Sequence, residues 1–345
     1  MMNFKVPSRL RRLLVDSVEL PQLKFPMTQP LSQPSRRRVS TRPAPQQLTE
    51  VLWFGRNPGN LRMLEYVPPG VKGPMPLVVV LHGCHQNAED FDGASGWTAL
   101  ARKHGFAVLY AEQKASNNPN LCFNWFRPSL VTRDRGELGS IREMIDFSRR
   151  LHAIDDGRIF VMGLSAGGAL AAALLATYPE LFAAGAIIGG LPFGAARDAM
   201  SALDVMKRGS TRPAEKWGEL VREVSPEATR YPVVSIWHGD EDEVVSFANA
   251  EASVAQWLAA RERPRTKGRL RLFEGGERRE WRDSYGHTIL ELITLNGFGH
   301  GLPVSAVVEG REPANDTERY ILPAVLSAPE ELVKGWKLAS PKQGA

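Results

Sequence analysis

A serine stands between two glycines in the run Gly163-Leu164-Ser165-Ala166-Gly167. A serine hydroxyl is a weak nucleophile at neutral pH, but on a sharp turn between a strand and a helix it can be activated to attack a carbonyl carbon. An apolar run precedes Ser165 and an alanine-rich run follows it, as that setting requires. The glycines suit a strained turn that leaves no room for Cβ atoms. The pattern predicts a nucleophile at Ser165, and the alternative is an ordinary turn with a serine capping the helix.

A nucleophilic serine needs a histidine as general base and an acid that orients the base. In the strand–turn–helix setting these partners follow the serine in the order acid, then histidine. The run His238–Val245 contains four acids after a predicted strand, and we take Asp242 as the acid, with Asp240 as second choice. His300, in a glycine-rich segment after the last predicted strand, is the expected base, and His287 is the weaker candidate.

The negative oxygen formed during acyl transfer must be bound by two backbone N–H groups. One comes from the residue after the nucleophile, here Ala166, and the other from the loop after an early strand. The early loop reads Leu81-His82-Gly83-Cys84, so the Cys84 N–H is the expected second donor. His82 is a candidate substrate-binding residue, and we expect it to brace the loop rather than to transfer protons.

These residues must be positioned by an alternation of strands and helices. A hairpin is expected over residues 48–67, around the turn signal Asn57-Pro58-Gly59-Asn60. Buried strands are predicted at residues 77–81, 106–111 and 158–163, and further strands at residues 182–188, 232–237, 270–273 and 289–295. Helices are predicted at residues 88–103, 137–152, 166–178 and 246–261, with a helical excursion over residues 192–231. The alternation predicts an α/β domain over residues 46–338, with a mostly parallel sheet, helices on both faces and the antiparallel hairpin at one edge.

The composition limits the class of protein. The chain has 345 residues, of which 43% are hydrophobic and 23% charged, an ordinary balance for a globular protein with a sizeable core. No apolar run approaches the roughly 18 residues of a membrane-spanning helix. Two cysteines are too few for a disulfide-stapled fold and too few for a structural zinc site.

The positive charge of the chain is concentrated at its N-terminus. Residues 1–45 hold nine Lys or Arg, two acids and seven prolines, and their formal charge of +7 exceeds the +5 of the whole chain. We expect a disordered tail there, a second short tail over residues 339–345, and no nucleic-acid partner. No secretory signal is visible, which favours a cytoplasmic protein.

Together these segments resemble the polyhydroxybutyrate (PHB) depolymerase-like esterases, a branch of the α/β-hydrolase fold related to feruloyl and acetylxylan esterases. The matching segments are residues 81–87, 122–126, 163–168, 238–245 and 299–303. The resemblance implies serine-dependent hydrolysis of carboxylic esters without a metal or organic cofactor. It gives Ser165, Asp242 and His300 the same three roles.

The resemblance also implies that residues 122–126 lie near the mouth of the site. Asn124 and Trp125 are therefore candidate substrate-binding residues, although packing beneath the loop is an equal alternative for Trp125. Cys84 and Cys122 both fall on these loops, either as a disulfide or as two buried thiols. Members of this family that are secreted carry a signal and often a polymer-binding domain, and the absence of both here puts solid polymer in doubt as a substrate.

Three hypotheses follow. The first is an esterase that cleaves short hydroxyalkanoate oligomers, polymer or related small esters. The second is a feruloyl esterase, an acetylxylan esterase or a peptidase on the same fold. The third is a binding protein on a hydrolase scaffold that has lost its activity. The sequence does not define the natural ester or the oligomeric state. The alternative to a cytoplasmic location is an extracellular one, which the family resemblance favours.

Overall fold

The computed structural model describes residues 48–264, 266–305 and 318–339. All of these residues belong to one compact unit of the chain. The predicted basic tail over residues 1–45 lies outside the described residues, as do residues 340–345 of the predicted C-terminal tail. Of the helices in the described ranges, none combines the length and the apolar character needed to cross a bilayer.

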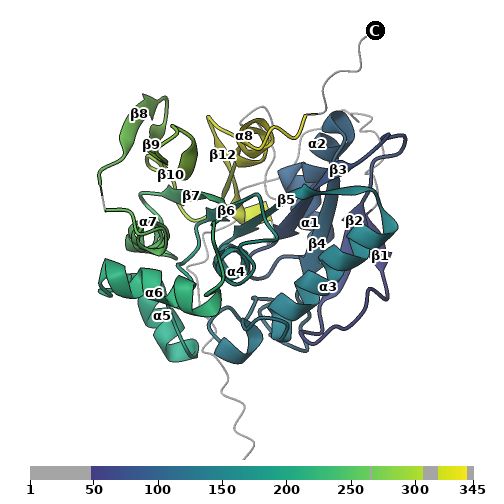
Figure 1. Cartoon of the computed structure of the whole chain (residues 1–345), viewed down its shortest axis with the longest axis horizontal. Coiled ribbons are helices and arrows are strands. Elements are labelled where there is room, and N and C mark those ends of the chain that lie inside the picture. Colours follow the sequence, from purple (N-terminus) through teal and green to yellow (C-terminus); the bar gives the residue numbers. More distant parts are fainter. Residues whose placement is uncertain (1–47, 265, 306–317, 340–345) are drawn as a thin grey trace, which may run out of the picture. The chain divides into compact units, whose positions relative to one another are not determined.

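One large sheet runs through the described core, in the order β1-β2-β4-β3-β5-β6-β7-β10-β9-β8 (Figure 1). Neighbours from β4 to β10 in this order are parallel, whereas the pairs at both ends of the sheet are antiparallel. Its strands are β1 (Thr49–Val51), β2 (Arg62–Tyr66), β3 (Met75–Leu81), β4 (Ala107–Glu112), β5 (Ile154–Leu164), β6 (Ala184–Ile188), β7 (Val233–Gly239), β8 (Arg269–Phe273), β9 (Gly276–Arg282) and β10 (Thr288–Leu295). The predicted hairpin is therefore confirmed as the β1–β2 pair at one edge.

The central strands are buried on both faces, which explains their unbroken apolar sequences. Every residue of β3 is buried. Leu77, Val79 and Leu81 pack into the core on one face, and Val78 and Val80 pack into the core on the other. Because successive side chains of a strand point to opposite faces, one β-branched run fills both cores at once.

Helices cover both faces of the sheet (Figure 1). Buried side chains of α3, α4, α6 and α7 belong to the core on one face, and those of α1, α2 and α8 belong to the core on the other. The helices are α1 (Ala88–Ser95), α2 (Trp97–His104), α3 (Gly136–Leu151), α4 (Ala166–Thr177), α5 (Ala199–Arg208), α6 (Ala214–Val224), α7 (Ala248–Ala260) and α8 (Ala328–Gly335). Two short strands, β11 (Leu302–Ser305) and β12 (Ile321–Ala324), pair in parallel as a separate small sheet.

The structure differs from the sequence prediction in three places. The single helix expected over residues 88–103 is two helices, because Gly96 adopts a left-handed conformation with φ of 78° and ends α1. Strand β9 was not predicted, because its sequence is mostly charged and contains no run of apolar residues. The elements after residue 300, including α8, were also not predicted.

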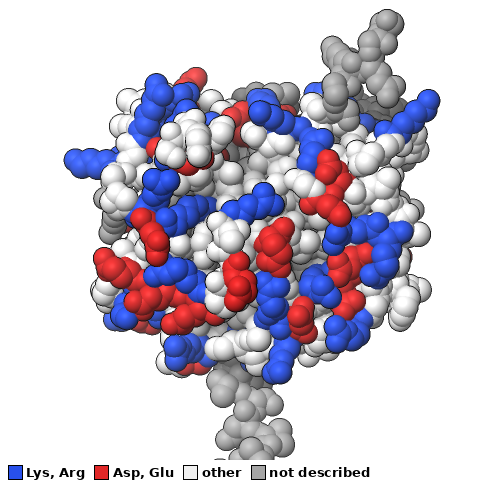
Figure 2. All heavy atoms as spheres, viewed as in Figure 1, with Lys and Arg blue, Asp and Glu red and all other residues white. Residues whose placement is uncertain are grey.

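The surface carries charges of both signs. Figure 2 shows acidic and basic side chains interspersed over one face of the described residues. Many of them form exposed ion pairs, such as Lys216 with Glu219 at 2.7 Å and Arg208 with Asp204 at 3.2 Å. Exposed pairs of this kind add little to stability, so the fold depends mainly on the two cores.

The carboxyl ends of the parallel strands meet at one edge of the sheet, where loops can form a site. Hydrogen bonds connect these loops in steps. The N–H of Ser165 after β5 donates to the carbonyl of Ile188 at the end of β6, at 2.8 Å. The N–H of Gly189 then donates to Trp237 in β7 at 2.8 Å, and the N–H of Asp240 donates to Leu295 in β10 at 3.1 Å. Segments far apart in the sequence are thereby held side by side.

Candidate active site

Ser165 occupies the turn between β5 and α4. Its backbone φ is 57°, which a residue other than glycine rarely adopts and which is typical of strained turns at functional sites. A Cβ atom on Gly163 would lie 2.1 Å from the carbonyl oxygen of Gly167, and one on Gly167 would lie 2.4 Å from that of Leu81. Only glycine fits at either position, because the turn is packed directly against the backbone of α4 and β3.

Asp242 and His300 form a hydrogen-bonded pair beyond the ends of β7 and β10. The Nδ1–H of His300 donates to Oδ2 of Asp242 at 2.7 Å, and the other carboxylate oxygen accepts the N–H groups of Val244 and Val245 at 2.9 and 2.8 Å. Burial raises the pKa of Asp242, but hydrogen bonds from His238 and His300 and their electrostatic attraction for the carboxylate outweigh it and hold the pKa well below its ordinary value. An ionised Asp242 therefore keeps the proton of His300 on Nδ1.

Gly189 connects this pair to the serine turn. It directly follows Ile188, whose carbonyl binds the Ser165 N–H. A Cβ atom on Gly189 would lie 3.2 Å from both Cε1 and Nδ1 of His300 and 3.6 Å from Oδ2 of Asp242. The imidazole and the serine turn therefore both lie against the end of β6.

We expect Gly189→Ala to lower kcat for p-nitrophenyl butyrate about 10–100-fold, because a methyl group there displaces the imidazole from its working position. The matched control is Gly286→Ala. Gly286 also has a positive φ, 85°, but its Cβ would meet no atom within 4 Å. Steady-state kinetics of both variants separate displacement of His300 from general backbone strain, and equal losses in the two variants would contradict this account.

His238 is a second histidine on Asp242, and the sequence reasoning gave it no role. Its side chain is fully buried, and its Nε2–H donates to the carbonyl of Val245 at 2.7 Å while lying 3.3 Å from Oδ2 of Asp242. Its buried Nδ1 has no partner within the described part of the chain. In the sequence, the sign that His238 contacts Asp242 was its place at the end of a buried strand, four residues before this acid.

The two weaker candidates, Asp240 and His287, have other places in the structure. Asp240 accepts the N–H of Gly297 at 2.6 Å, so it fastens the loop that precedes His300. The side chain of His287 is 78% exposed and lies 3.4 Å from Asp283. Neither candidate contacts the pair formed by Asp242 and His300 in the interactions of the described residues.

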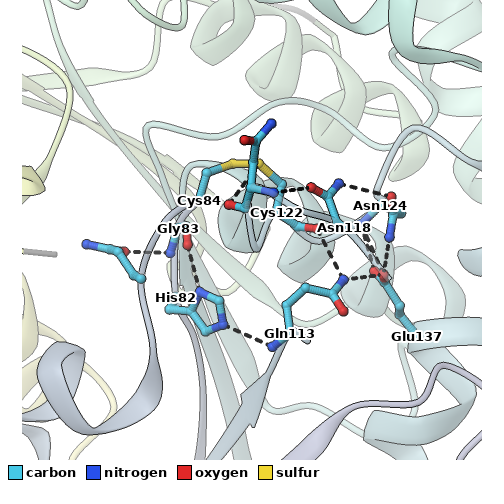
Figure 3. The surroundings of a disulfide bond; sticks show 10 residues. His82, Gly83, Cys84, Gln113, Asn118, Cys122, Asn124 and Glu137 are labelled. Carbon is cyan, nitrogen blue, oxygen red and sulfur yellow. Dashed lines mark hydrogen bonds between the residues drawn. A yellow bond between two sulfur atoms is a disulfide. The ribbon is translucent and has the colours of Figure 1, made fainter. Parts of the chain in front are cut away.

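The loop after β3 lies against the serine turn. A Cβ atom on Gly83 would lie 3.6 Å from Cβ of Ser165. Cys84 and Cys122 are joined by a disulfide bond (Figure 3), and both pack against the apolar cluster that contains Ala166 and Trp125. The two expected oxyanion donors therefore belong to adjoining segments.

Treatment with reductant should lower the thermal midpoint of unfolding, because a disulfide typically contributes about 2–4 kcal/mol to stability. The unfolded protein should show no reactive thiol without reductant and two with it, since the described residues include no free cysteine. Thiol titration in denaturant and a thermal scan check the two expectations. Two reactive thiols without reductant would contradict the bridge.

Two of the predicted substrate-binding residues, His82 and Asn124, are buried in the structure. His82 is fully buried, and its ring nitrogens contact the Gly83 carbonyl and the Gln113 N–H at 2.6 and 3.1 Å (Figure 3). Asn124 is 1% exposed and bonds to Glu137 and Asn118. All of these polar groups are hydrogen-bonded inside the protein, so both side chains brace the loops beside Ser165, and their contact with a substrate stays a prediction. Trp125 is 8% exposed, and its contact with substrate stays a prediction.

The described residues contain no cluster of three or more His, Cys, Asp or Glu side chains that could hold a metal ion. The groups that this site offers for chemistry are the Ser165 hydroxyl, the His300–Asp242 pair and the N–H groups beside the disulfide.

The sheet order and the place of Ser165 within it define an α/β-hydrolase fold. A solved structure shares it: the acetyl xylan esterase from Aspergillus awamori superposes with a TM-score of 0.68 at 25% sequence identity, covering 74% of this chain and 94% of that one. The predicted fold class is confirmed. More narrowly, the chain belongs to the Esterase PHB depolymerase family, whose family model matches residues 61–280.

The chain is similar in sequence to three kinds of esterase. Poly(3-hydroxyalkanoate) depolymerase C from Paucimonas lemoignei is 41% identical over 258 residues, which is 74% of this chain and 62% of the depolymerase. An acetylxylan esterase from Coprinopsis cinerea is 31% identical over 76% of this chain and 72% of its own length. A feruloyl esterase B from Thermothelomyces thermophilus is 32% identical over 61% of this chain and 74% of its own length. The predicted family resemblance is confirmed.

Proposed function

We propose that the protein is a serine carboxylic ester hydrolase that works through an acyl-enzyme. The observation that carries the proposal is the 2.7 Å hydrogen bond between His300 Nδ1 and Asp242 Oδ2, which lies over Gly189 beside the strained turn of Ser165. Membership of the esterase family and the names of the relatives support the same reaction class.

The proposed reaction has two halves. Nε2 of His300 takes the proton of the Ser165 hydroxyl as Oγ attacks the ester carbonyl, and the ionised Asp242 stabilises the resulting imidazolium. The N–H groups of Ala166 and Cys84 bind the oxyanion of the tetrahedral intermediate. His300 then protonates the leaving alcohol. A water molecule, deprotonated by His300, releases the acyl group and restores Ser165.

The proposed substrates are short-chain hydroxyalkanoate oligomers or polymer, or related small esters. The apolar cluster around Ala166 includes Trp125 and Leu191 and favours an acyl group without charge. Trp125 packs edge-on against Phe126, with ring centroids 5.6 Å apart, which fixes the orientation of its ring. We propose that this ring forms one wall of the acyl site.

A fluorophosphonate probe tests the reaction class. It should label the native protein at Ser165, as shown by peptide mapping, and should leave heat-denatured protein unlabelled. Labelling at another residue would contradict the assignment of the nucleophile. Unlabelled native protein would support the binding-protein hypothesis instead.

Product analysis then tests the substrate class. Pure protein is incubated with hydroxybutyrate oligomers, amorphous polymer, feruloyl esters and acetylated xylan. Release of hydroxybutyrate at the highest kcat/KM is the expected result. Faster release of ferulate or acetate would reassign the substrate while leaving the reaction class intact, because fold and triad do not define the acyl group.

A further inference from the structure

Glu137 is a buried carboxylate to which the proposed reaction gives no role. It is the second residue of α3 and only 1% exposed. Its Oε1 accepts from the side-chain nitrogens of Gln113 and Asn124 at 2.6 and 2.8 Å, and its Oε2 accepts the Asn124 N–H at 2.9 Å. All of these neighbours donate hydrogen bonds, so the side chain at position 137 must be one that only accepts hydrogen bonds.

A first arm leads from Glu137 to the loop after β3, through Gln113 and His82 (Figure 3). The side-chain nitrogen of Gln113 bonds to Glu137 and also to the Cys122 carbonyl at 3.1 Å. The backbone N–H of Gln113 donates to Nε2 of His82 at 3.1 Å. Nε2 is thus an acceptor, so the proton lies on Nδ1, which donates to the Gly83 carbonyl at 2.6 Å.

The first arm ends on the peptide group that carries the expected oxyanion donor. The carbonyl of Gly83 and the N–H of Cys84 belong to one planar unit and point in opposite directions. A hydrogen bond that holds the carbonyl therefore also sets the direction of the Cys84 N–H. Burial lowers the pKa of His82 to about 4, against a weaker opposing effect of its bond to Gly83, so the ring stays neutral around pH 7.

A second arm leads from Glu137 to the other side of Cys84, through three asparagines. Oδ1 of Asn124 accepts from the Asn118 side chain at 3.2 Å, and Oδ1 of Asn118 accepts the Asn120 N–H at 3.0 Å. The carbonyl of Asn120 accepts the N–H of His85, the residue after Cys84, at 2.8 Å. Because Glu137 binds the amide nitrogen of Asn124, the amide oxygen of Asn124 faces Asn118, and the amide oxygen of Asn118 in turn faces the Asn120 N–H.

We propose that Glu137 is a positioning residue of the oxyanion hole, holding both arms so that the Cys84 N–H points at the developing negative charge. The inference rests on the proposed ester hydrolysis. The disulfide alone ties Cys84 to Cys122, but it does not orient the peptide plane. The first arm holds that plane through the Gly83 carbonyl, and the second arm holds the next peptide group, between Cys84 and His85, so Cys84 is fixed on both sides.

The test is Glu137→Gln, which keeps the shape of the side chain but turns one acceptor into a donor facing N–H groups. We expect kcat for p-nitrophenyl butyrate to fall about 10–100-fold with KM nearly unchanged, somewhat less than the loss of a whole oxyanion donor. The inhibition constant of a trifluoromethyl ketone, whose adduct places an oxyanion in the hole, should rise by the same factor as kcat falls. A general loosening of the fold would not move these two quantities together.

Glu143→Gln is the matched control, on the same helix. Glu143 pairs with the exposed Arg56 at 3.1 Å and has no part in either arm, so its kcat should match the wild type. Asn118→Ala cuts only the second arm and should give a smaller loss in kcat, again with KM unchanged. If Glu137→Gln does not fold, Asn118→Ala tests the proposal in its place.

The outcomes separate the two claims. Wild-type kcat and inhibition in a folded Glu137→Gln, or in Asn118→Ala if Glu137→Gln does not fold, would overturn the inference and leave the proposed function intact. A loss confined to KM would overturn it as well. Wild-type protein whose hydrolysis does not depend on Ser165 would contradict the proposed function, and the inference with it.

Discussion

Ser165→Ala will lower kcat for p-nitrophenyl butyrate by about 10⁴–10⁶-fold, because the acyl-enzyme cannot form without Oγ. The fold should survive, since the side chain of Ser165 makes no hydrogen bond in the described part of the protein that the fold would lose. Steady-state kinetics with purified variant and wild type, together with circular dichroism, measure both expectations.

Ser284→Ala is the control for this variant. Ser284 is exposed in the turn before β10, away from the ends of the parallel strands, and its replacement should leave kcat unchanged. Hydrolysis by Ser165→Ala at more than a tenth of the wild-type rate would mean that another group attacks the ester.

Asp242→Asn will lower kcat by about 10³–10⁴-fold with little change in KM, because the variant favours the wrong tautomer of His300. The amide oxygen must face the two N–H groups of Val244 and Val245, since the amide nitrogen would clash with them. The amide nitrogen then faces His300 and donates to Nδ1, so the ring proton moves to Nε2. A histidine that carries its proton on Nε2 cannot accept one from Ser165.

Asp240→Asn is the control in the same loop. Asp240 binds the Gly297 N–H through one oxygen, and the amide oxygen of asparagine can make the same bond. The expected kcat is within about threefold of the wild type, as for surface substitutions that keep a hydrogen bond. A larger loss in Asp240→Asn than in Asp242→Asn would exchange the roles given to the two acids.

Much of the fold could be predicted because its central strands are buried on both faces. A strand such as β3 leaves a continuous β-branched run in the sequence, and a parallel sheet places all such runs between helices. The serine turn was predictable for a related reason. Close backbone contacts force glycine at positions 163 and 167, which gives the turn a recognisable spacing.

The edges of the sheet could not be predicted in the same way. Strand β9 pairs its own charges, Arg279 with Glu277 and Arg282 with Glu280, and buries few apolar side chains, so it has no period-two pattern. Gly96 interrupts an otherwise helical pattern, and a single glycine does not show whether a helix ends or continues.

The polar residues of the site could be located but not oriented from the sequence. His82 and Asn124 stand on the loops beside Ser165, where contact with a substrate and bracing of the backbone need the same residue types. Only their burial and partners distinguish the two roles. Glu137 was missed because a buried carboxylate leaves no local pattern in the sequence, and His238 was missed because its place at the end of a strand, four residues before Asp242, was its single signal.

The left-handed backbone at residue 165 has a consequence for how this protein can be improved in the laboratory. Glycine at that position would adopt the same geometry without steric conflict and would relieve about 1–2 kcal/mol of tension. Selection for heat resistance alone would therefore favour Ser165→Gly, and it would deliver a sturdier molecule that has lost its nucleophile. A screen for more heat-stable variants of this protein therefore has to measure ester hydrolysis in every round as well.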